Sequence, residues 1–207
     1  MKKAIELLVH AYPNSDSEDD PVSLARRRLI CSAFAAGALA PLAGSAMADD
    51  SKEGRARPQP GDVFVFADGD NEGKPIAPAD IPLNSQQIMA WPMDPSASIV
   101  RDGSRLNQVM LIRLDPASLD ESTTARAADG ILAFSAICTH QQCPVTEWRP
   151  DSGHLRCPCH ESEFDPRAEG KPVGGPARRK LASLPVKIQD GQLIAAGTFV
   201  GKVGTGA

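Results

Sequence analysis

The chain has 207 residues, with 22 lysines and arginines against 26 aspartates and glutamates, so its formal net charge is −4. Nucleic-acid binding needs a concentrated basic face, and base stacking needs aromatic side chains, which are only 4% of this chain. We therefore expect no nucleic-acid partner. The apolar fraction of 42% is enough to build a core, and the length predicts one domain plus an extension.

Residues 1–48 have the layout of an export signal. Arg26-Arg27-Arg28 are followed by two apolar residues and an Ala/Gly-rich stretch that ends in small residues at Ala48. This order is typical of export signals, and the paired arginines resemble the twin-arginine class. We expect export to the periplasm and cleavage after Ala48. The alternative is that residues 29–48 stay as an inner-membrane anchor, since 20 residues are about the length that spans a bilayer.

The rest of the chain divides into a linker and one β-rich domain. Residues 49–60 contain two prolines and are expected to be a flexible linker. Residues 61–207 contain short apolar runs bounded by turn residues, which predict strands. These runs are 62–67, 87–91, 109–114, 131–137, 184–189 and 192–196. Many short strands separated by turns predict an all-β fold, a sandwich or a small barrel.

Two connections between these runs are distinctive. Asp190-Gly191 separates the last two runs and predicts a two-residue hairpin turn. Residues 115–129 contain helix-start residues and several alanines, so they are either a short helix or a long surface loop.

Four of the five cysteines fall within 22 residues, in the segments CTHQQC and CPCH. Cysteine and histidine at short, fixed offsets let a loop aim two side chains at one metal ion. Three kinds of site fit the residues alone. They are a structural zinc site, a pair of disulfides with incidental histidines, and a two-iron cluster held by two cysteines and two histidines.

The order of these residues resembles the Rieske 2Fe-2S signature, which is Cys-x-His, 16 residues, then Cys-x-x-His. The extra cysteines match the disulfide-containing subtype of quinol–cytochrome c oxidoreductases and arsenite oxidase small subunits. The resemblance implies stacked antiparallel sheets, a small cluster-binding subdomain of loops at about residues 136–178, and one 2Fe-2S cluster per chain. A structural zinc-binding protein is the alternative.

The resemblance also implies roles for individual side chains. The implied iron ligands are Cys138 and Cys157 on one iron and His140 and His160 on the other, and the implied disulfide joins Cys143 to Cys159. His160 matches an exposed histidine that contacts quinol in the quinol-oxidising members. Ser162 matches a serine whose hydroxyl donates to a bridging sulfide, and Phe164 stands where high-potential members have a tyrosine. We therefore expect a potential toward the middle of the Rieske range of about −150 to +300 mV.

Several positions depart from the quinol-oxidising members. Gly174-Gly175-Pro176-Ala177 resembles their cluster-covering loop, but Arg178 follows where they have proline. Gln141, Gln142 and Glu161 replace an apolar residue and two glycines, which makes the docking face more polar.

The resemblance implies one-electron transfer by a subunit with no turnover of its own. Its implied partners are a larger redox subunit, a cytochrome c-type acceptor or quinol. A retained anchor favours a quinol–cytochrome c reductase. The polar docking face, Phe164 and a cleaved signal favour a periplasmic molybdenum oxidoreductase such as arsenite oxidase.

Overall fold

The computed structural model describes residues 50–205, with Asp50 and Ser51 described by backbone alone. The expected export signal and anchor therefore lie outside the described residues. Within residues 50–205, no helix combines the length and the apolar character that crossing a membrane would require.

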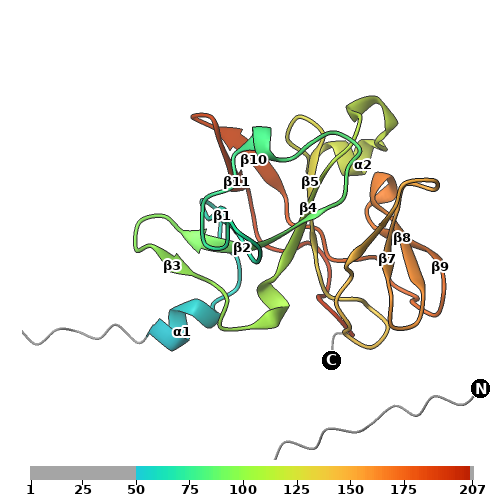
Figure 1. The fold of residues 1–207 in the computed structure, drawn as a ribbon, viewed down its shortest axis with the longest axis horizontal. Helices are drawn as coiled ribbons and strands as arrows, with labels where there is room; N and C mark the ends of the chain where they lie inside the picture. Colours follow the sequence, from blue (N-terminus) through green and yellow to red (C-terminus); the bar gives the residue numbers. More distant parts are fainter. Residues whose placement is uncertain (1–49, 206–207) are drawn as a thin grey trace, which may run out of the picture. The chain divides into compact units, whose positions relative to one another are not determined.

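Seven strands form an antiparallel sheet, which occupies the left and centre of Figure 1. Their order is β10-β11-β1-β2-β4-β5, and β3 pairs with β2. The strands are β1 Val63–Phe66, β2 Ile88–Asp94, β3 Ile99–Val100, β4 Val109–Arg113, β5 Ile131–Ser135, β10 Val186–Gln189 and β11 Gln192–Ala195. Five of the six predicted apolar runs contain one of these strands, and the sixth, 87–91, covers the first part of β2, so the prediction of an all-β fold is confirmed.

The turn between β10 and β11 has the predicted form. Gln189 pairs with Gln192, which leaves two residues in the loop. Asp190 and Gly191 both have positive φ, 52° and 78°. A two-residue turn with both φ angles positive matches the right-handed twist of the strands that it joins.

Four further strands form a second antiparallel sheet in the order β6-β7-β8-β9, at the right of Figure 1. They are β6 Glu147–Arg149, β7 His154–Cys157, β8 Ser162–Asp165 and β9 Lys171–Gly174. The sequence did not predict them. Each has only three or four residues, and in β7 and β8 every second side chain is buried while the others are charged or polar. Two inward residues per strand are too few to show a periodic apolar pattern.

The described helices are all short. They are α1 Asp50–Arg55, η1 Pro78–Asp80, η2 Arg105–Asn107, η3 Pro116–Ser118, α2 Glu121–Thr124 and η4 Pro166–Ala168. Part of the expected linker is thus helical, and it is joined to the domain because Asn107 Nδ2 donates to Ala56 O at 2.8 Å. Residues 115–129 hold both η3 and α2, so they combine the two alternatives that the sequence left open.

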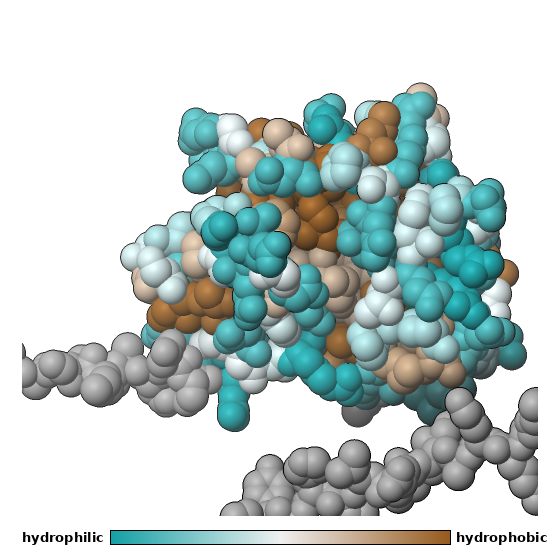
Figure 2. Space-filling view, in the orientation of Figure 1, coloured by the Kyte–Doolittle hydropathy of each residue, from teal (hydrophilic) through white to brown (hydrophobic). Residues whose placement is uncertain are grey.

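Strands β4 and β5 separate two apolar cores because both of their faces are buried. Val109 and Leu111 of β4 belong to the first core, together with side chains of β1 and β11. Met110 and Ile112 belong to the second core, which also contains side chains of β7 and β8. The second core therefore joins the two sheets. The surface in Figure 2 is mostly polar with scattered apolar patches, and the exposed large apolar residues are Leu83, Val173, Ile188 and Val200.

Candidate metal centre

The first cysteine-bearing segment is a tight loop that follows β5. We call residues Cys138–Cys143 the first loop. The amide of Cys138 donates to the carbonyl of Cys143 at 2.8 Å, and the amide of Gln142 donates to the carbonyl of Cys138 at 3.1 Å. The chain therefore reverses over four residues, and Gln142, the last of them, is left-handed with φ of 60°.

The second cysteine-bearing segment is the turn of the β7–β8 hairpin. We call residues Cys157–Ser162 the second loop, since Cys157 and Ser162 are paired across the hairpin. Four residues again separate the pair, and the last of them, Glu161, is left-handed with φ of 58°. The two loops thus share one backbone design.

Side-chain contacts hold the two left-handed residues. A side chain on a left-handed residue costs of order 1–3 kcal/mol unless its surroundings fix it. Gln142 Nε2 donates to Thr205 Oγ1 at 2.6 Å, and Arg156 Nη2 donates to Glu161 Oε1 at 2.5 Å. The polar residues that stand where relatives have glycine therefore have structural partners of their own.

A third loop, residues 174–180, covers the first two. The amide of Ala177 donates to Ser162 Oγ at 3.2 Å, and Thr139 Oγ1 donates to the carbonyl of Arg179 at 2.7 Å. Gly175 has φ of 71°, and a Cβ placed on it would lie 2.5 Å from the carbonyl oxygen of Glu161. Only glycine fits this close approach.

A disulfide between Cys143 and Cys159 joins the first loop to the second, as the resemblance implied, and their Cα atoms are 6.4 Å apart. The remaining described cysteines, Cys138 and Cys157, are free and each is 1% exposed. The sulfur atoms of Cys143, Cys157 and Cys159 lie within 4.8 Å of one another. Because two of them form the disulfide, this trio is a disulfide packed against one free thiol and is not itself a metal site.

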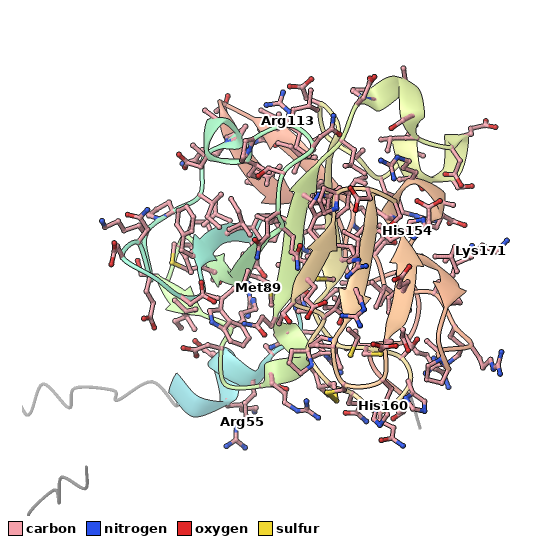
Figure 3. The ribbon with its side chains drawn as sticks, turned by 45° about the vertical axis from the view of Figure 1, so that its right-hand side comes forward. Arg55, Met89, Arg113, His154, His160 and Lys171 are labelled. Carbon is pink, nitrogen blue, oxygen red and sulfur yellow. A yellow bond between two sulfur atoms is a disulfide. The ribbon has the colours of Figure 1, made fainter. Side chains whose placement is uncertain are left out.

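The two histidines of the loops face each other (Figure 3 labels His160). Their ring centroids are 4.8 Å apart and their planes are nearly perpendicular, at 88°. His140 is half-buried and His160 is exposed. His140 Nδ1 is buried and has no hydrogen-bond partner among the described residues. A buried polar atom without a partner costs about 1–3 kcal/mol, so a bound metal is a physical reason for leaving it unpaired.

Backbone amides surround the two free sulfurs. His140 N donates to Cys138 Sγ at 3.5 Å, and the amides of Cys159 and His160 donate to the sulfur of Cys157. Burial raises the pKa of the Cys157 thiol, while those two amide hydrogen bonds oppose the rise. Amide hydrogen bonds to sulfur favour the thiolate form, which is the form that binds metal.

Two buried thiols, two facing imidazoles and one orphaned ring nitrogen fit a 2Fe-2S group with mixed ligands. In such a group two histidines replace two cysteines on one of the two irons. Ser162 is fully buried and its oxygen already accepts from Ala177, so its hydroxyl proton is available to an acceptor. Phe164 is fully buried in the second core, which also contains Cys138 and Cys157.

Comparisons with known proteins agree with this donor set. The family model of the Rieske [2Fe-2S] domain matches residues 107–185. The cytochrome bc1 complex Rieske iron-sulfur subunit of Streptomyces lividans is 33% identical over 141 residues, which are 65% of this chain and 81% of that protein. The chain belongs to the Rieske iron–sulfur protein family. The predicted family and the predicted 2Fe-2S cofactor are therefore confirmed, and Rieske domains hold this cluster.

Other Rieske proteins match as well. The cytochrome bc1 complex Rieske iron-sulfur subunit of Corynebacterium glutamicum is 40% identical over 104 residues, which are 47% of this chain and 26% of that protein. The chain thus matches about a quarter of that relative's length. Among solved structures, the ferredoxin of carbazole 1,9a-dioxygenase from Nocardioides aromaticivorans is 19% identical, covers 67% of this chain and 99% of its own, and has a TM-score of 0.41.

Sequence reasoning missed the contacts that hold the Rieske loops in place. Arg105 Nη1 donates to the carbonyl of Gln142 at 2.6 Å across a separation of 37 residues, and the contact of Gln142 with Thr205 spans 63 residues. No local pattern marks such partners, because each is defined only when the fold brings distant segments together.

Proposed function

We propose that this chain is the Rieske iron–sulfur subunit of a cytochrome bc1-type complex and transfers one electron at a time. The names of its curated relatives support this assignment. The observation that carries it is that the two loops joined by the disulfide also hold two free buried thiols and two imidazoles that face each other. The chain has no turnover of its own in this proposal, and its partner is a larger redox subunit or a cytochrome c-type acceptor.

Four side chains hold the cluster in this proposal, Cys138 and Cys157 on one iron and His140 and His160 on the other. When bound, the cluster supplies reversible one-electron transfer at about −150 to +300 mV. The chain itself orients the ligands. The buried thiols are fixed in the second core and by amide donors, while the exposed His160 presents its ring to a quinol or to a redox partner.

The test compares two histidines in the assembled complex. His160→Gln removes a proposed ligand at the exposed tip, whereas His154→Gln changes a histidine on β7 whose ring faces Glu163 at 3.3 Å. Membranes carrying His160→Gln are expected to lose quinol-dependent cytochrome c reduction at least tenfold (about 1.4 kcal/mol in barrier), and those carrying His154→Gln to keep it. Equal rates in the two variants would overturn the assignment.

A second candidate is the small subunit of a periplasmic molybdenum oxidoreductase such as arsenite oxidase. Phe164 and the polar residues Gln141, Gln142 and Glu161 favour it, because they depart from the quinol-oxidising pattern. Under this alternative, His160→Gln abolishes arsenite-dependent reduction of the acceptor and leaves quinol oxidation intact. The same two variants therefore distinguish the complexes.

The export assignment is part of the proposal, since it rests on Arg26-Arg27-Arg28 and the small residues up to Ala48. A disulfide between Cys143 and Cys159 supports it, because disulfides persist in oxidising compartments. The double variant Arg26→Lys/Arg27→Lys is expected to keep the protein in the cytoplasm. The mass of the exported chain without these substitutions distinguishes the two alternatives, cleavage after Ala48 and a retained anchor.

A further inference from the structure

An ion pair closes the base of the second loop. Arg156 directly precedes the loop, and its Nη2 donates to Oε1 of Glu161, the last residue of the turn, at 2.5 Å. The contact therefore spans the four residues Cys157–His160, which include two of the proposed cluster ligands. A bond between the two ends of this segment limits how far they can separate.

The guanidinium of Arg156 is itself held in place. Leu155 and Cys157 are buried, so Arg156 lies on the opposite face of β7. Its Nη1 donates at 2.5 Å to Oε2 of Glu147, its cross-strand neighbour on β6, and its side chain is only 18% exposed. Hydrogen bonds between charged groups are among the stronger ones in proteins. Strand β6 thus fixes the arginine that binds the loop.

Glu161 needs such a restraint because of its backbone. Its φ of 58° lies in the left-handed region, which favours glycine. A Cβ on Gly175 would lie 2.5 Å from the Glu161 carbonyl oxygen, so the third loop is packed directly against this peptide. A residue other than glycine keeps a left-handed conformation only where its surroundings hold it. The ion pair with Arg156 supplies that restraint.

The conformation of Glu161 affects the ligand-bearing part of the loop. Glu161 directly follows His160, and a change in its φ rotates the peptide that joins the two residues. The amides of Cys159 and His160 donate to the sulfur of Cys157, and they do so within a turn that reverses the chain over four residues. A different conformation at Glu161 would therefore disturb these amide donors and the orientation of the His160 ring.

The first loop has a related contact. Its left-handed residue is Gln142, and Arg105 donates to both the carbonyl and the Oε1 of this residue, at 2.6 and 3.3 Å. Because one of these bonds is to the backbone, it would remain with glycine at this position. In the second loop the described contact is made by the Glu161 side chain, so glycine would remove it. The second loop therefore gives the cleaner test.

We propose that Arg156 is a positioning residue, which acts through Glu161 to hold the second loop and the exposed His160 in their cluster-binding arrangement. Arg156 does not itself bind the cluster. This inference rests on the proposed function, in which His160 is a ligand. It has one specific consequence: Arg156 matters to the loop only while residue 161 carries a side chain.

The test measures the effect of Arg156→Met in three backgrounds of the cluster-loaded full chain. The rate of cluster loss to excess chelator is followed by visible absorbance. Arg156→Met is expected to accelerate loss about threefold to fivefold in the otherwise unchanged chain, the range of an exposed ion pair. In the Glu161→Gln background, which keeps an acceptor oxygen without the charge, at least about a twofold effect is expected. In the Glu161→Gly background less than about a 1.5-fold effect is expected, because glycine needs no restraint.

This comparison separates positioning from other roles of the arginine. If Arg156 acted only through its charge or through its contact with Glu147, Arg156→Met would have the same effect in all three backgrounds. Electron paramagnetic resonance of the reduced protein gives a second readout. Arg156→Met is expected to broaden the spectrum, since the ligand geometry becomes heterogeneous, and Arg156→Met/Glu161→Gly to restore its width. Arg149→Met removes the same charge from an exposed site on β6 and is expected to change neither readout.

Equal effects of Arg156→Met in the unchanged chain and in the Glu161→Gly background would overturn the inference, as would an effect no larger than that of Arg149→Met. If Arg156→Met does not load a cluster, Arg156→Met/Glu161→Gly is expected to load one, and its failure would also overturn the inference. A four-cysteine type of spectrum in the unchanged chain would overturn the proposed function, and the inference with it. The spectrum of the unchanged chain therefore distinguishes the two failures.

Discussion

Gly175 is a residue at which the third loop lies close against the second. Its φ is 71°, and a Cβ at this position would lie only 2.5 Å from the Glu161 carbonyl oxygen, so there is no room for a side chain. Gly175→Ala is expected to lower the free energy of unfolding by more than about 2 kcal/mol, because it adds a clash to an unfavourable backbone conformation. Urea denaturation of the cluster-loaded protein measures the change.

The neighbouring glycine is the control for this prediction. A Cβ on Gly174 would make an ordinary contact of 3.5 Å with Glu163 Cβ, and its φ is not in the left-handed region. Gly174→Ala is therefore expected to change stability by less than about 1 kcal/mol. Equal losses in the two alanine variants would contradict the close approach of the loops.

Phe164 is a position at which one substitution is expected to change the reduction potential. It is fully buried in the core that contains both free cysteines. Phe164→Tyr is expected to raise the reduction potential by about 20–65 mV, the equivalent of one hydrogen bond of about 0.5–1.5 kcal/mol to a cluster sulfur. Voltammetry measures the shift. Phe64→Tyr makes the same change in the first core and is expected to leave the potential unchanged. An unaltered potential in Phe164→Tyr with an intact cluster would count against this role.

The sequence predicts the site residues that lie close together along the chain, and it does not predict the contacts between distant loops. The disulfide partners and the candidate ligands lie in two contiguous segments whose spacing is set by four-residue loops, so their pattern is visible in the sequence. The pairing of Thr139 with the Arg179 carbonyl and of Gln142 with Thr205 depends on how distant loops meet. Those contacts leave no local signal.

At the scale of elements, a buried ion pair joins the start of β1 to the residue that follows β3. Arg101 Nε and Nη2 donate to the two carboxylate oxygens of Asp62 at 2.6 and 2.9 Å, and both side chains are buried. Hydrogen bonding to Asp62 raises the pKa of Arg101, while burial opposes it. Arg101→Met removes the charged partner of this buried carboxylate and leaves it only the Gln59 amide, so we expect a loss of about 3–5 kcal/mol in unfolding free energy.

The control is an exposed ion pair on the same sheet. Arg113 of β4 pairs with Asp129, whose side chain is 62% exposed. Arg113→Met is expected to change the unfolding free energy by less than about 1 kcal/mol. Thermal or urea denaturation compares the two variants, and similar losses would show that the Asp62 pair is not the stronger one.

Glu169 joins two loop residues, Arg126 and Lys180, and makes stability depend on pH. Hydrogen bonds from Lys180 and then Arg126 hold the pKa of this carboxyl below its ordinary value of about 4.5. A lowered pKa in the folded state stabilises the fold above the unfolded-state pKa, and this contribution is lost as pH falls through the folded-state pKa. Glu169→Gln is expected to cost about 1 kcal/mol at pH 7 and progressively less below about pH 4.5. A difference that stays constant between pH 7 and pH 3 would contradict this.

The two sheets differ in how well the sequence predicts them. Strands β4 and β5 are buried on both faces, so they appear as continuous apolar runs, Val109–Arg113 and Ile131–Ser135. Strands β6 to β9 bury few side chains each and are defined by pairing with one another. Their own composition therefore gives little signal in the sequence, and they become recognisable only through their pairing.

At the scale of the whole molecule, the described domain packs its two sheets against one shared apolar core, the second core. The second core contains Cys138 and Cys157 together with side chains of both sheets, so the two candidate cysteine ligands are fixed by the same packing that joins the sheets. His160 of the second loop is exposed to solvent.

The central claim is that two thiolates and two imidazoles of this chain hold a 2Fe-2S cluster. Electron paramagnetic resonance of the reduced full-length protein, with iron and acid-labile sulfide determined on the same sample, tests it most directly. We predict roughly two irons and two sulfides per chain and an average g value well below that of clusters with four cysteine ligands. A spectrum of the four-cysteine type, or zinc without sulfide, would contradict the account.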